Sequence, residues 1–403
     1  MQRTTKKFTA GRMDEGTRSD CLVEIEPGGR GGITLELESK VAPLYGDSIR
    51  AGLREACAAL GLSHAAFRII DQGALPYVLA ARIEAAVKRA LPGTVKEFLP
   101  RQAERRKLSA PGARFRRTRL YLPGNEPRFF PNAGLHGPDG VVLDLEDSVA
   151  PAEKDAARLV VRNALRCADF YGAERMVRIN QGRPGMEDLR VVVPQDPDVI
   201  VIPKCEDPEG VREVGAEIRA LEKRHGTARE TLLLPIIENA LGVVNAFAIA
   251  TASPRVCALA IGLEDYTADI GVERTAEGLE SLFARMTIVN AAKAAGVQAL
   301  DSVFSDVDDA AGLRTTALRA RSLGFDGMGC IHPRQVEVIH AAFAPSAEEI
   351  RKAEEVVSAA RDAQKRGSGV AALGARMVDA PVVARAERIL RLAGRPGRGG
   401  DGR

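Results

Sequence analysis

Short apolar segments alternate with helical segments through the middle of the chain. Eight apolar runs recur between residues 118 and 333, and most of them end in Gly, Pro or an ionisable residue. This repeated alternation of strand and helix favours a closed (β/α)8 barrel over an open doubly wound sheet, which would more often carry a Gly-rich phosphate turn. We therefore predict an α/β protein built on a (β/α)8 TIM barrel. The eight runs are "TRLYLPG", "GVVLDLED", "RMVRINQ", "DVIVIPKCE", "LLLPIIEN", "ALAIGLEDY", "VQALDSV" and "FDGMGCIHP".

The N-terminal part of the chain has a different pattern. A possible strand "CLVEIEP", from Cys21, is followed by "GGRGG" and by "ITLELES", from Ile33, in which apolar residues alternate with polar ones. This alternation after a Gly-rich connection predicts a two-stranded hairpin. A helix that ends at Gly61, a third strand "AAFRIID" and a second helix complete the pattern. Residues 1–91 are therefore predicted to form a small α+β domain.

Three further segments complete the predicted organisation. Residues 92–115 are rich in Pro, Lys and Arg and carry only two aromatic residues, Phe98 and Phe115, which favours a basic linker over a nucleic-acid-binding tract. Residues 116–345 form the barrel, and residues 346–394 are predicted to be a C-terminal helical lid. Residues 395–403, "RPGRGGDGR", are predicted to be disordered because they are rich in Gly and Arg.

Composition excludes several classes of protein. The formal net charge is only +3, which gives no reason to expect a nucleic-acid partner. The chain has no apolar run long enough to span a membrane and no secretory signal at its N-terminus. Its six cysteines are scattered, with no CxxC pair and no spacing typical of a metal site. We expect a cytoplasmic protein without disulfides, structural zinc or a membrane partner.

Ionisable or polar residues follow nearly every apolar run. One acidic cluster, Asp144, Glu146 and Asp147, could cap the helix that follows it. However, the carboxyl ends of barrel strands open together on the active-site face, so polar residues at nearly all of the eight ends favour a site. They are Asp144, Glu146, Arg178, Asn180, Lys204, Glu206, Glu238, Asn239, Glu264, Asp265, Asp301 and His332.

The residue types at these strand ends narrow the chemistry. Carboxylates without a His or Cys cluster suit Mg²⁺, which takes one or two protein carboxylates and completes its shell with water and substrate oxygens. Glu238 and Asp265 follow adjacent strands, so they are expected to share one ion. Arg178 would then be free to bind a substrate carboxylate or carbonyl with two hydrogen bonds. This combination suggests an aldolase or lyase that acts on acidic substrates.

Two strand-end residues keep more than one interpretation. Lys204 is a candidate Schiff-base lysine, but "PKCEDPEG" leads directly into a helix start, so a structural or anion-binding lysine is at least as well supported. His332 stands alone before Pro333, which favours a structural role over a catalytic one.

These residues carry a resemblance to a known family. "RRTRLYLPGNEPRFF", "VVLDLEDSVAPAEKDAAR", "VRIN", "VIPKCEDPEGV", "PIIENALGVVNAFAIA", "AIGLEDYTADIG", "GFDGMGCIHPRQVEVIHAAFAPS" and "RMVDAPVVARAERIL" are similar, in order, to the citrate lyase β-chain family. That family lies within the HpcH/HpaI aldolase superfamily and includes malyl- and citramalyl-CoA lyases. The resemblance implies a Mg²⁺-dependent retro-Claisen cleavage of a 3-hydroxyacyl thioester by a homotrimeric or homohexameric barrel.

The resemblance also assigns roles to individual residues. It implies that Glu238 and Asp265 are the metal ligands and that Arg178 binds substrate. It implies that Asp144 and Asp147 hold water that is bound to the metal. Where the family usually has "ET", this chain has Glu238 followed by Asn239. That difference beside the metal is expected to affect the choice of substrate.

More distant residues also receive roles from the resemblance. Asp379 in "MVDAP" resembles the aspartate that a C-terminal lid lends to the site of a neighbouring subunit as general acid or base. Arg117 and Lys154 occupy positions that would face the phosphates of the CoA thioester.

The N-terminal domain has a resemblance of its own. "ITLELESKVAPLYGDSIRAGLREACAALGLSHAAFRIIDQGALPYVLAARIEAAVKRA" is similar to the acyl carrier (γ) subunit of citrate lyase. In that family a serine carries a phosphoribosyl-dephospho-CoA arm. If Asp20 aligns with the family's aspartate, Arg18 stands where the serine should be, and Ser19 follows one residue later. Two hypotheses remain: Ser19 carries the arm, or the domain is degenerate and only assists assembly.

The predicted activity is therefore that of a carbon–carbon lyase, an oxo-acid lyase that cleaves or forms a citryl-, citramalyl- or malyl-type thioester. The acyl group would be carried by CoA or by the protein's own carrier, with a transferase subunit as a further partner. One alternative is a pyruvate-type aldolase that uses no thioester. The other is a non-catalytic assembly subunit of a lyase complex, which clustered charges at strand ends disfavour.

Overall fold

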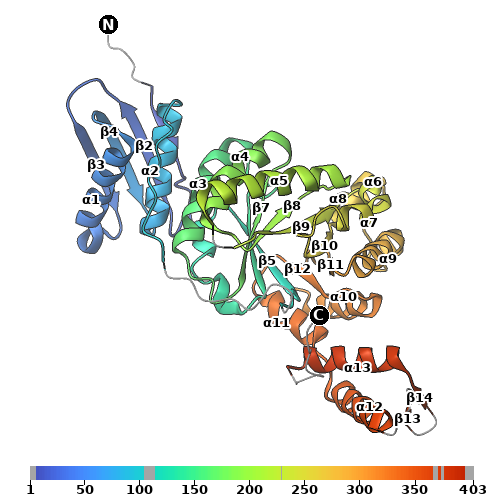
Figure 1. Cartoon of the computed structure of the whole chain (residues 1–403). Coiled ribbons are helices and arrows are strands. Elements are labelled where there is room, and N and C mark those ends of the chain that lie inside the picture. The colour runs from blue at the N-terminus through green and yellow to red at the C-terminus, as the bar shows by residue number, and fades with distance from the viewer. Residues whose placement is uncertain (1–5, 104–113, 228, 366–370, 374–375, 395–403) are drawn as a thin grey trace. The chain divides into compact units, whose positions relative to one another are not determined.

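A computed structural model of the chain describes residues 6–103, 114–227, 229–365, 371–373 and 376–394. The chain divides into two compact units, Met1–Ile339 and His340–Arg403. The first unit contains an N-terminal module and a barrel, and the second contains the C-terminal helices (Figure 1). The domain boundaries drawn from the sequence stay a prediction, and the predicted disordered tail lies outside the described residues.

Eight parallel strands close into a barrel in the order of the sequence, and β12 pairs with β5 to complete it. Each strand coincides with one of the apolar runs, so the predicted (β/α)8 barrel is confirmed. The runs form strands because they are bounded by Gly, Pro or acidic residues and are too short for buried helices. The strands are β5 (Thr118–Pro123), β6 (Gly140–Asp144), β7 (Glu174–Arg178), β8 (Val199–Ile202), β9 (Leu232–Ile237), β10 (Ala258–Ile261), β11 (Gln298–Asp301) and β12 (Gly327–Cys330).

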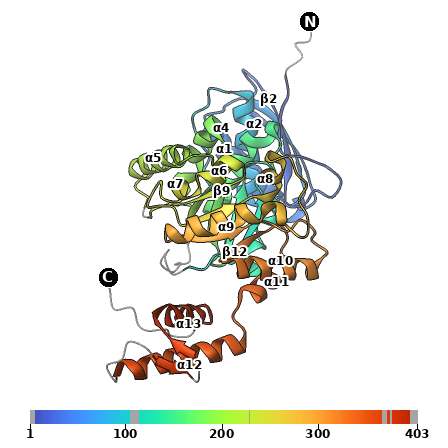
Figure 2. The same cartoon turned by 90° about the vertical axis from the view of Figure 1, so that its right-hand side faces the viewer.

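Helices surround the barrel on its outer face (Figure 2 turns α6–α9 toward the viewer). Helix α5 shows why they form: Asp207 accepts the N–H groups of Glu209 and Gly210 at its start, and Gly226 ends it in a left-handed conformation. Short 3-10 turns lie at Pro127–Phe129, Ala133–His136, Pro151–Glu153 and Val193–Gln195. The helices are α3 (Lys154–Cys167), α4 (Gly182–Val192), α5 (Pro208–His225), α6 (Ala240–Val244), α7 (Ala246–Ala250), α8 (Leu263–Asp269), α9 (Leu279–Ala294), α10 (Ala310–Leu323) and α11 (Arg334–Phe343).

The N-terminal module is a four-stranded sheet with two helices. Its strand order is β1-β2-β4-β3, with β2 antiparallel to β4 and β3 parallel to β4. The predicted hairpin of β2 and β3 is therefore wrong, because β4 lies between them. Alternation shows that a strand is half-buried but does not select its neighbour, and the α1 crossover brings β4 parallel to β3. The elements are β1 (Phe8–Ala10), β2 (Cys21–Pro27), β3 (Ile33–Ser39), α1 (Ala42–Leu60), β4 (Ala65–Asp71) and α2 (Pro76–Ala90).

The module is joined to the barrel through α2 and α3, which lie side by side (Figure 1). Arg162 on α3 donates to both carboxylate oxygens of Glu84 on α2, at 3.0 and 2.7 Å, and both side chains are completely buried. Nearby, Asn163 donates to the carbonyl of Tyr77. A buried ion pair of this kind orients the two helices because each charge is satisfied in one geometry.

Replacing Glu84 with alanine is expected to lower the free energy of unfolding by about 3–5 kcal/mol, because Arg162 would remain buried without its buried partner and with only the partly exposed Glu97 as counter-ion. Urea unfolding followed by circular dichroism measures the loss. Glu97 is the matched control: its carboxylate also contacts Arg162, but its side chain is 41% exposed. Glu97→Ala is expected to cost less than about 1 kcal/mol. Equal losses in the two variants would contradict the role given to the buried pair.

The C-terminal unit contains two helices and a short hairpin. Helices α12 (Ala347–Lys365) and α13 (Ala380–Leu392) pack through a small apolar cluster around Ala353, Val357 and Leu390. Strands β13 (Ala371–Leu373) and β14 (Arg376–Val378) pair antiparallel. In the part of the chain that the structure describes, no helix is both long and apolar enough to cross a membrane.

Candidate active site

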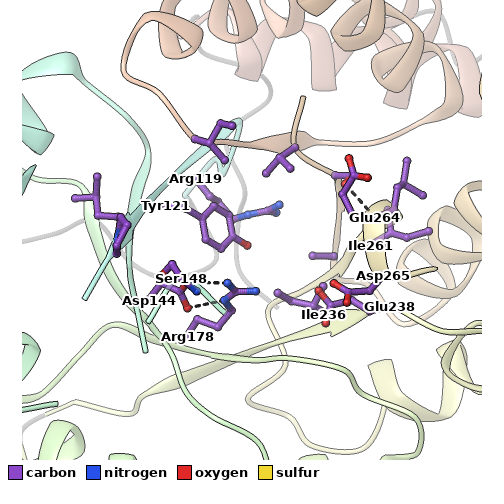
Figure 3. Close-up of a pocket in the computed structure, with 18 residues that line it drawn as sticks. Arg119, Tyr121, Asp144, Ser148, Arg178, Ile236, Glu238, Ile261, Glu264 and Asp265 are labelled. Carbon is purple, nitrogen blue, oxygen red and sulfur yellow. Dashed lines mark hydrogen bonds and ion pairs between the residues drawn. The ribbon is translucent and has the colours of Figure 1, made fainter. Parts of the chain in front are cut away.

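A pocket of about 290 Å³ lies at the carboxyl ends of the barrel strands (Figure 3). It opens where predicted, because every parallel strand of the barrel ends on this face. Five of the strand-end residues expected at the site from the sequence line this one pocket. They are Asp144, Arg178, Glu238, Glu264 and Asp265, and Ser148 lines it beside them.

Asp144 and Arg178 form a two-point ion pair at the ends of β6 and β7. The Nε and Nη2 atoms of Arg178 donate to the two carboxylate oxygens of Asp144, both at 2.7 Å. Asp144 also accepts the hydroxyl of Ser148 and is only 2% exposed. Burial alone would raise the pKa of Asp144, but Arg178 outweighs it and holds that pKa below its ordinary value. In this structure Arg178 makes its two-point contact with Asp144, and its Nη1 atom faces Glu146 at 3.0 Å. Binding of a substrate by Arg178 stays a prediction.

The acids that follow Asp144 face the same cations. Strand β6 ends at Asp144, so Glu146 and Asp147 lie in the loop beyond it, where strand alternation no longer applies. Glu146 lies 3.0 Å from Arg178 and 3.0 Å from Lys204, and Asp147 lies 3.2 Å from Lys204. Helix α3 begins only at Lys154, with Glu153 at its N-cap, so this acidic cluster does not cap it.

Lys204 connects this cluster to Glu238. Its backbone is left-handed, with φ at +48°, and its N–H donates to Glu238 Oε2 at 2.8 Å. Partial burial would lower the pKa of Lys204, but Glu146 and Asp147 outweigh it and raise that pKa above its ordinary value. A lysine held in its charged form is a poor Schiff-base nucleophile, so the geometry favours the structural interpretation of Lys204.

Glu238 is a buried carboxylate at the end of β9. It is 5% exposed, and burial raises its pKa to about 7, with a further contribution from Asp265. Gly262, after β10, leaves the space that the side chain occupies. A Cβ at position 262 would lie 2.6 Å from Glu238 Oε1, closer than a Cβ carbon and an oxygen approach in proteins. Glycine at this position therefore leaves the carboxylate of Glu238 room to point this way.

Carboxylates outnumber the cations Arg178 and Lys204 around the site, and this excess of negative charge suits a divalent cation. Within the described ranges, no three His, Cys, Asp or Glu side chains converge as a ready-made metal site. Glu238 directly follows β9, and Asp265 lies in the first turn of α8, which follows the neighbouring strand β10. These two oxygen donors fit Mg²⁺ because that ion retains water and substrate oxygens in its shell. The carboxylates that surround these two cations are Asp144, Glu146, Asp147, Glu238 and Asp265.

Arg117 and Lys154, which were predicted to face the phosphates of the thioester, do not line the pocket. Arg117 immediately precedes β5, so it lies at the amino end of the barrel strands, where it pairs with Asp139 at 2.8 and 2.9 Å. Lys154, at the start of α3, donates to the carbonyls of Leu145 and Glu146 and to Asn180. The contact of Arg117 and Lys154 with the phosphates of a thioester stays a prediction.

Other predicted residues lie elsewhere in the chain. Asp379 belongs to the second unit, where it caps α13 by accepting the N–H of Val382. Ser19, in the N-terminal module, has a left-handed backbone with φ at +54° and donates its N–H to Gln72. The Nδ1 atom of His332 accepts the N–H of Arg334, as expected of a structural histidine.

Sequence reasoning overlooked Arg119, Tyr121 and Ser148, all of which line the pocket. The ring of Tyr121 lies 5.6 Å from the guanidinium of Arg178. A signal was present, since Arg119 and Tyr121 share one face of β5 by alternation, and an arginine on the inner face of a barrel strand is unusual.

The barrel and the module each match a described family. Residues 117–333 match the HpcH/HpaI aldolase/citrate lyase family, and residues 6–90 match the malonate decarboxylase delta subunit (MdcD) family. The predicted resemblance of both parts of the chain is thereby confirmed.

Individual relatives agree with the family match. The chain is 41% identical over 287 residues to the citrate lyase subunit beta of Leuconostoc mesenteroides, covering 70% of this chain and 94% of that protein. It is 33% identical over 290 residues to the human mitochondrial citramalyl-CoA lyase, covering 69% and 85%. Its fold is similar to the crystal structure of the CitE protein of Mycobacterium tuberculosis in complex with magnesium, acetoacetate and coenzyme A. That match has a TM-score of 0.58 at 33% identity and covers 70% of this chain and 99% of the other.

Proposed function

The chain belongs to the HpcH/HpaI aldolase/citrate lyase family, and we propose that it is a Mg²⁺-dependent carbon–carbon lyase. Its substrate is a citryl-, citramalyl- or malyl-type 3-hydroxyacyl thioester, which it cleaves to, or forms from, an acetyl thioester and a 2-oxo acid. The observation that carries this proposal is the convergence of Glu238, Asp265 and Arg178 on one pocket at the carboxyl face of the barrel. Relatives named citrate lyase subunit beta and citramalyl-CoA lyase support the reaction class.

Glu238 and Asp265 hold the metal ion in this proposal. Bound there, Mg²⁺ supplies Lewis-acid polarisation of the hydroxy-acid oxygens of the substrate. The raised pKa of Glu238 supports the assignment, because a buried carboxylate without a full counter-charge has most to gain from a cation. Asp144 and Asp147 are assigned to hold water beside the ion, with Arg178 and Lys204 neutralising the excess charge.

The chain's own residues guide the bond cleavage. A base takes the hydroxyl proton, and the bond from the carbinol carbon to the methylene carbon of the thioester breaks. The electron pair of that bond moves onto the thioester as an enolate, and the carbinol carbon becomes the carbonyl of the 2-oxo acid. The remaining N–H groups of Arg178 stabilise the charge on the oxo-acid oxygens. Asp379 then protonates the methylene carbon to give the acetyl thioester.

The lyase proposal is tested by acetyl-CoA release from citryl-CoA, citramalyl-CoA and malyl-CoA, with and without Mg²⁺. Metal-dependent release from any of the three supports the proposal. Turnover of a 2-oxo acid and an aldehyde without any thioester would instead support the aldolase alternative. A folded, Mg²⁺-binding protein that is inactive on free and carrier-bound thioesters would support the assembly-subunit alternative.

Sharing of the site between subunits is part of the proposal, in which the protein is a homotrimer or homohexamer. Glu238→Gln and Asp379→Asn are each expected to be inactive alone, because each site then lacks its metal ligand or its proton donor. Asn still accepts the N–H of Val382, so α13 keeps its cap. Mixing the two variants under conditions that exchange subunits is expected to restore part of the activity. Light scattering verifies the mixed oligomers, and mixed oligomers without activity would contradict sharing.

The N-terminal module serves as a carrier in this proposal, with a phosphoribosyl-dephospho-CoA arm on Ser19 and a transferase subunit to load it. Its position supports the idea. Arg12 forms an ion pair with Glu126, and Arg82 donates to the carbonyl of Asn125, both in the loop after β5 on the active-site face.

The carrier proposal is tested by the intact mass of wild type and Ser19→Ala after coexpression with attachment enzymes. An adduct on the wild type alone supports the proposal, and an unmodified wild type contradicts it.

A reducing, cytosolic compartment completes the proposal, since all six cysteines are free.

A further inference from the structure

Arg119 is a buried arginine at the floor of the pocket. Strand pairing places it opposite Gly329 of β12 and Gly140 of β6, while Pro123 pairs with Asp144 at the mouth. It therefore starts four residues, or about 13 Å, deeper in the barrel than the strand ends. Its guanidinium reaches the last residue of β11, Asp301, and Nη2 donates to the carbonyl of that residue at 3.1 Å. The side chain is 1% exposed and lines the same pocket as Glu238 and Asp265.

The guanidinium of Arg119 lacks a counter-ion. Among the described residues, no acceptor reaches its Nε or Nη1 atoms and no carboxylate forms an ion pair with it. The nearby carboxylate of Asp301 is already engaged by Arg285 and by the N–H of Ser302. A buried charge with two unpaired donors is costly, so a protein retains one where a ligand supplies the missing acceptor.

The surroundings of Arg119 leave room for such a ligand. Figure 3 shows the guanidinium projecting past the ring of Tyr121 into the space that Glu238 and Asp265 face from the other side. Gly329 lies beside it, and a Cβ there would be 3.6 Å from Arg119 Nη2 but only 2.7 Å from Val303 Cγ1. Position 329 therefore has no room for a side chain next to the guanidinium.

We propose that Arg119 binds a second carboxylate of the hydroxy-acid portion of the substrate, so that the site selects citryl-type thioesters. This inference rests on the proposed lyase function and specifies its substrate. The thioester carries a long arm that must leave through the mouth, so the acid end of the molecule is the part that reaches the floor. With the hydroxyl and one carboxylate held at Glu238, Asp265 and Arg178, a citryl group still has a carboxymethyl arm. A citramalyl group has only a methyl group there, and a malyl group only hydrogen, so both would leave Arg119 unpaired.

The test compares wild type with Arg119→Met, which keeps an unbranched apolar stem and removes the guanidinium with its charge, and Arg119→Lys, which keeps the charge. Calorimetric titration in Mg²⁺ measures the binding of oxaloacetate, which has the second carboxylate, and of pyruvate, which does not. Wild type is expected to bind oxaloacetate at least about 10-fold more tightly than pyruvate, because a hydrogen-bonded charge pair is made only with the former. In Arg119→Met this preference is expected to disappear, with pyruvate affinity changed less than about twofold. Arg119→Lys should retain part of the preference.

Stability separates this role from a structural one. Removing an unpaired buried charge should leave the thermal unfolding midpoint of Arg119→Met unchanged or raised, whereas loss of a structural ion pair would lower it. Equal affinity of wild type for oxaloacetate and pyruvate would overturn the proposal even if the Met variant fails to fold. So would a folded Met variant that keeps the preference.

The two proposals fail in different ways. If wild type cleaves no thioester but its oxaloacetate binding depends on Arg119, the lyase function fails and the carboxylate subsite stands. If wild type cleaves thioesters and Arg119→Met keeps the same ratio of kcat/KM for citryl-CoA over citramalyl-CoA, the subsite fails and the lyase function stands.

Discussion

Glu238→Gln is expected to lower Mg²⁺-dependent kcat by about 10³-fold or more while leaving the barrel folded. Glutamine has the shape of glutamate and its amide oxygen can still accept the N–H of Lys204, so the loop after β8 keeps its contact. What is lost is the negative charge that the metal ion requires. Calorimetric titration with Mg²⁺ should show weakened binding in the variant, and circular dichroism should show an unchanged fold.

Glu264→Gln is the matched control for this prediction. Glu264 lines the same pocket, but it forms an ion pair with Arg274 and points away from Glu238 (Figure 3). Its loss is expected to change kcat by less than about tenfold, since an exposed ion pair contributes little. If Glu264→Gln were the inactive variant and Glu238→Gln retained turnover, the metal would have to be reassigned within the pocket.

Arg178→Lys is expected to reduce kcat by about 10²–10³-fold. A lysine ammonium cannot donate two parallel hydrogen bonds to Asp144 and also direct N–H groups into the pocket, whereas the guanidinium of Arg178 does the first and is placed for the second. Steady-state kinetics with varied substrate distinguishes the two consequences. A fall in kcat with little change in KM indicates lost stabilisation of the transition state, whereas a change in KM alone would contradict the role given to Arg178.

Arg178→Met separates the structural contribution of this residue from its catalytic one. Without the guanidinium of Arg178, Asp144 remains buried with no counter-ion from that residue. The free energy of unfolding is therefore expected to fall by about 3–5 kcal/mol. The double variant Arg178→Met with Asp144→Asn removes that unpaired charge and is expected to recover much of the stability, but none of the activity. Recovery of both would mean that Arg178 acts only by holding the loop.

The position of the site could be predicted from the sequence because a parallel barrel brings the carboxyl ends of all its strands to one face. Apolar runs with the ionisable residues Asp144, Arg178, Glu238 and Asp265 just beyond them were sufficient to gather these four side chains in one pocket. No distance had to be known, since the topology makes positions that are far apart in sequence converge.

Pairings between side chains could not be predicted in the same way. The two-point pair of Arg178 with Asp144, the contact of Lys204 N–H with Glu238 and the space that Gly262 leaves depend on differences of one or two ångströms. The strand order of the N-terminal module escaped prediction for a related reason. Alternation defines a buried face, but the neighbour of β2 is chosen by packing of the whole sheet, which inserts β4 beside it.

The sequence by itself determined the barrel and the carboxylate and arginine chemistry of the site, because these follow from periodicity and residue type, and its resemblance to a carrier family identified the N-terminal module. Only the tertiary structure decided which charges are paired and which are not. Arg119 shows the difference: in the sequence it is one of many basic residues near the linker, whereas in the barrel it is buried with two donors unsatisfied. Burial makes an unpaired charge costly, and burial is a property of the folded chain alone.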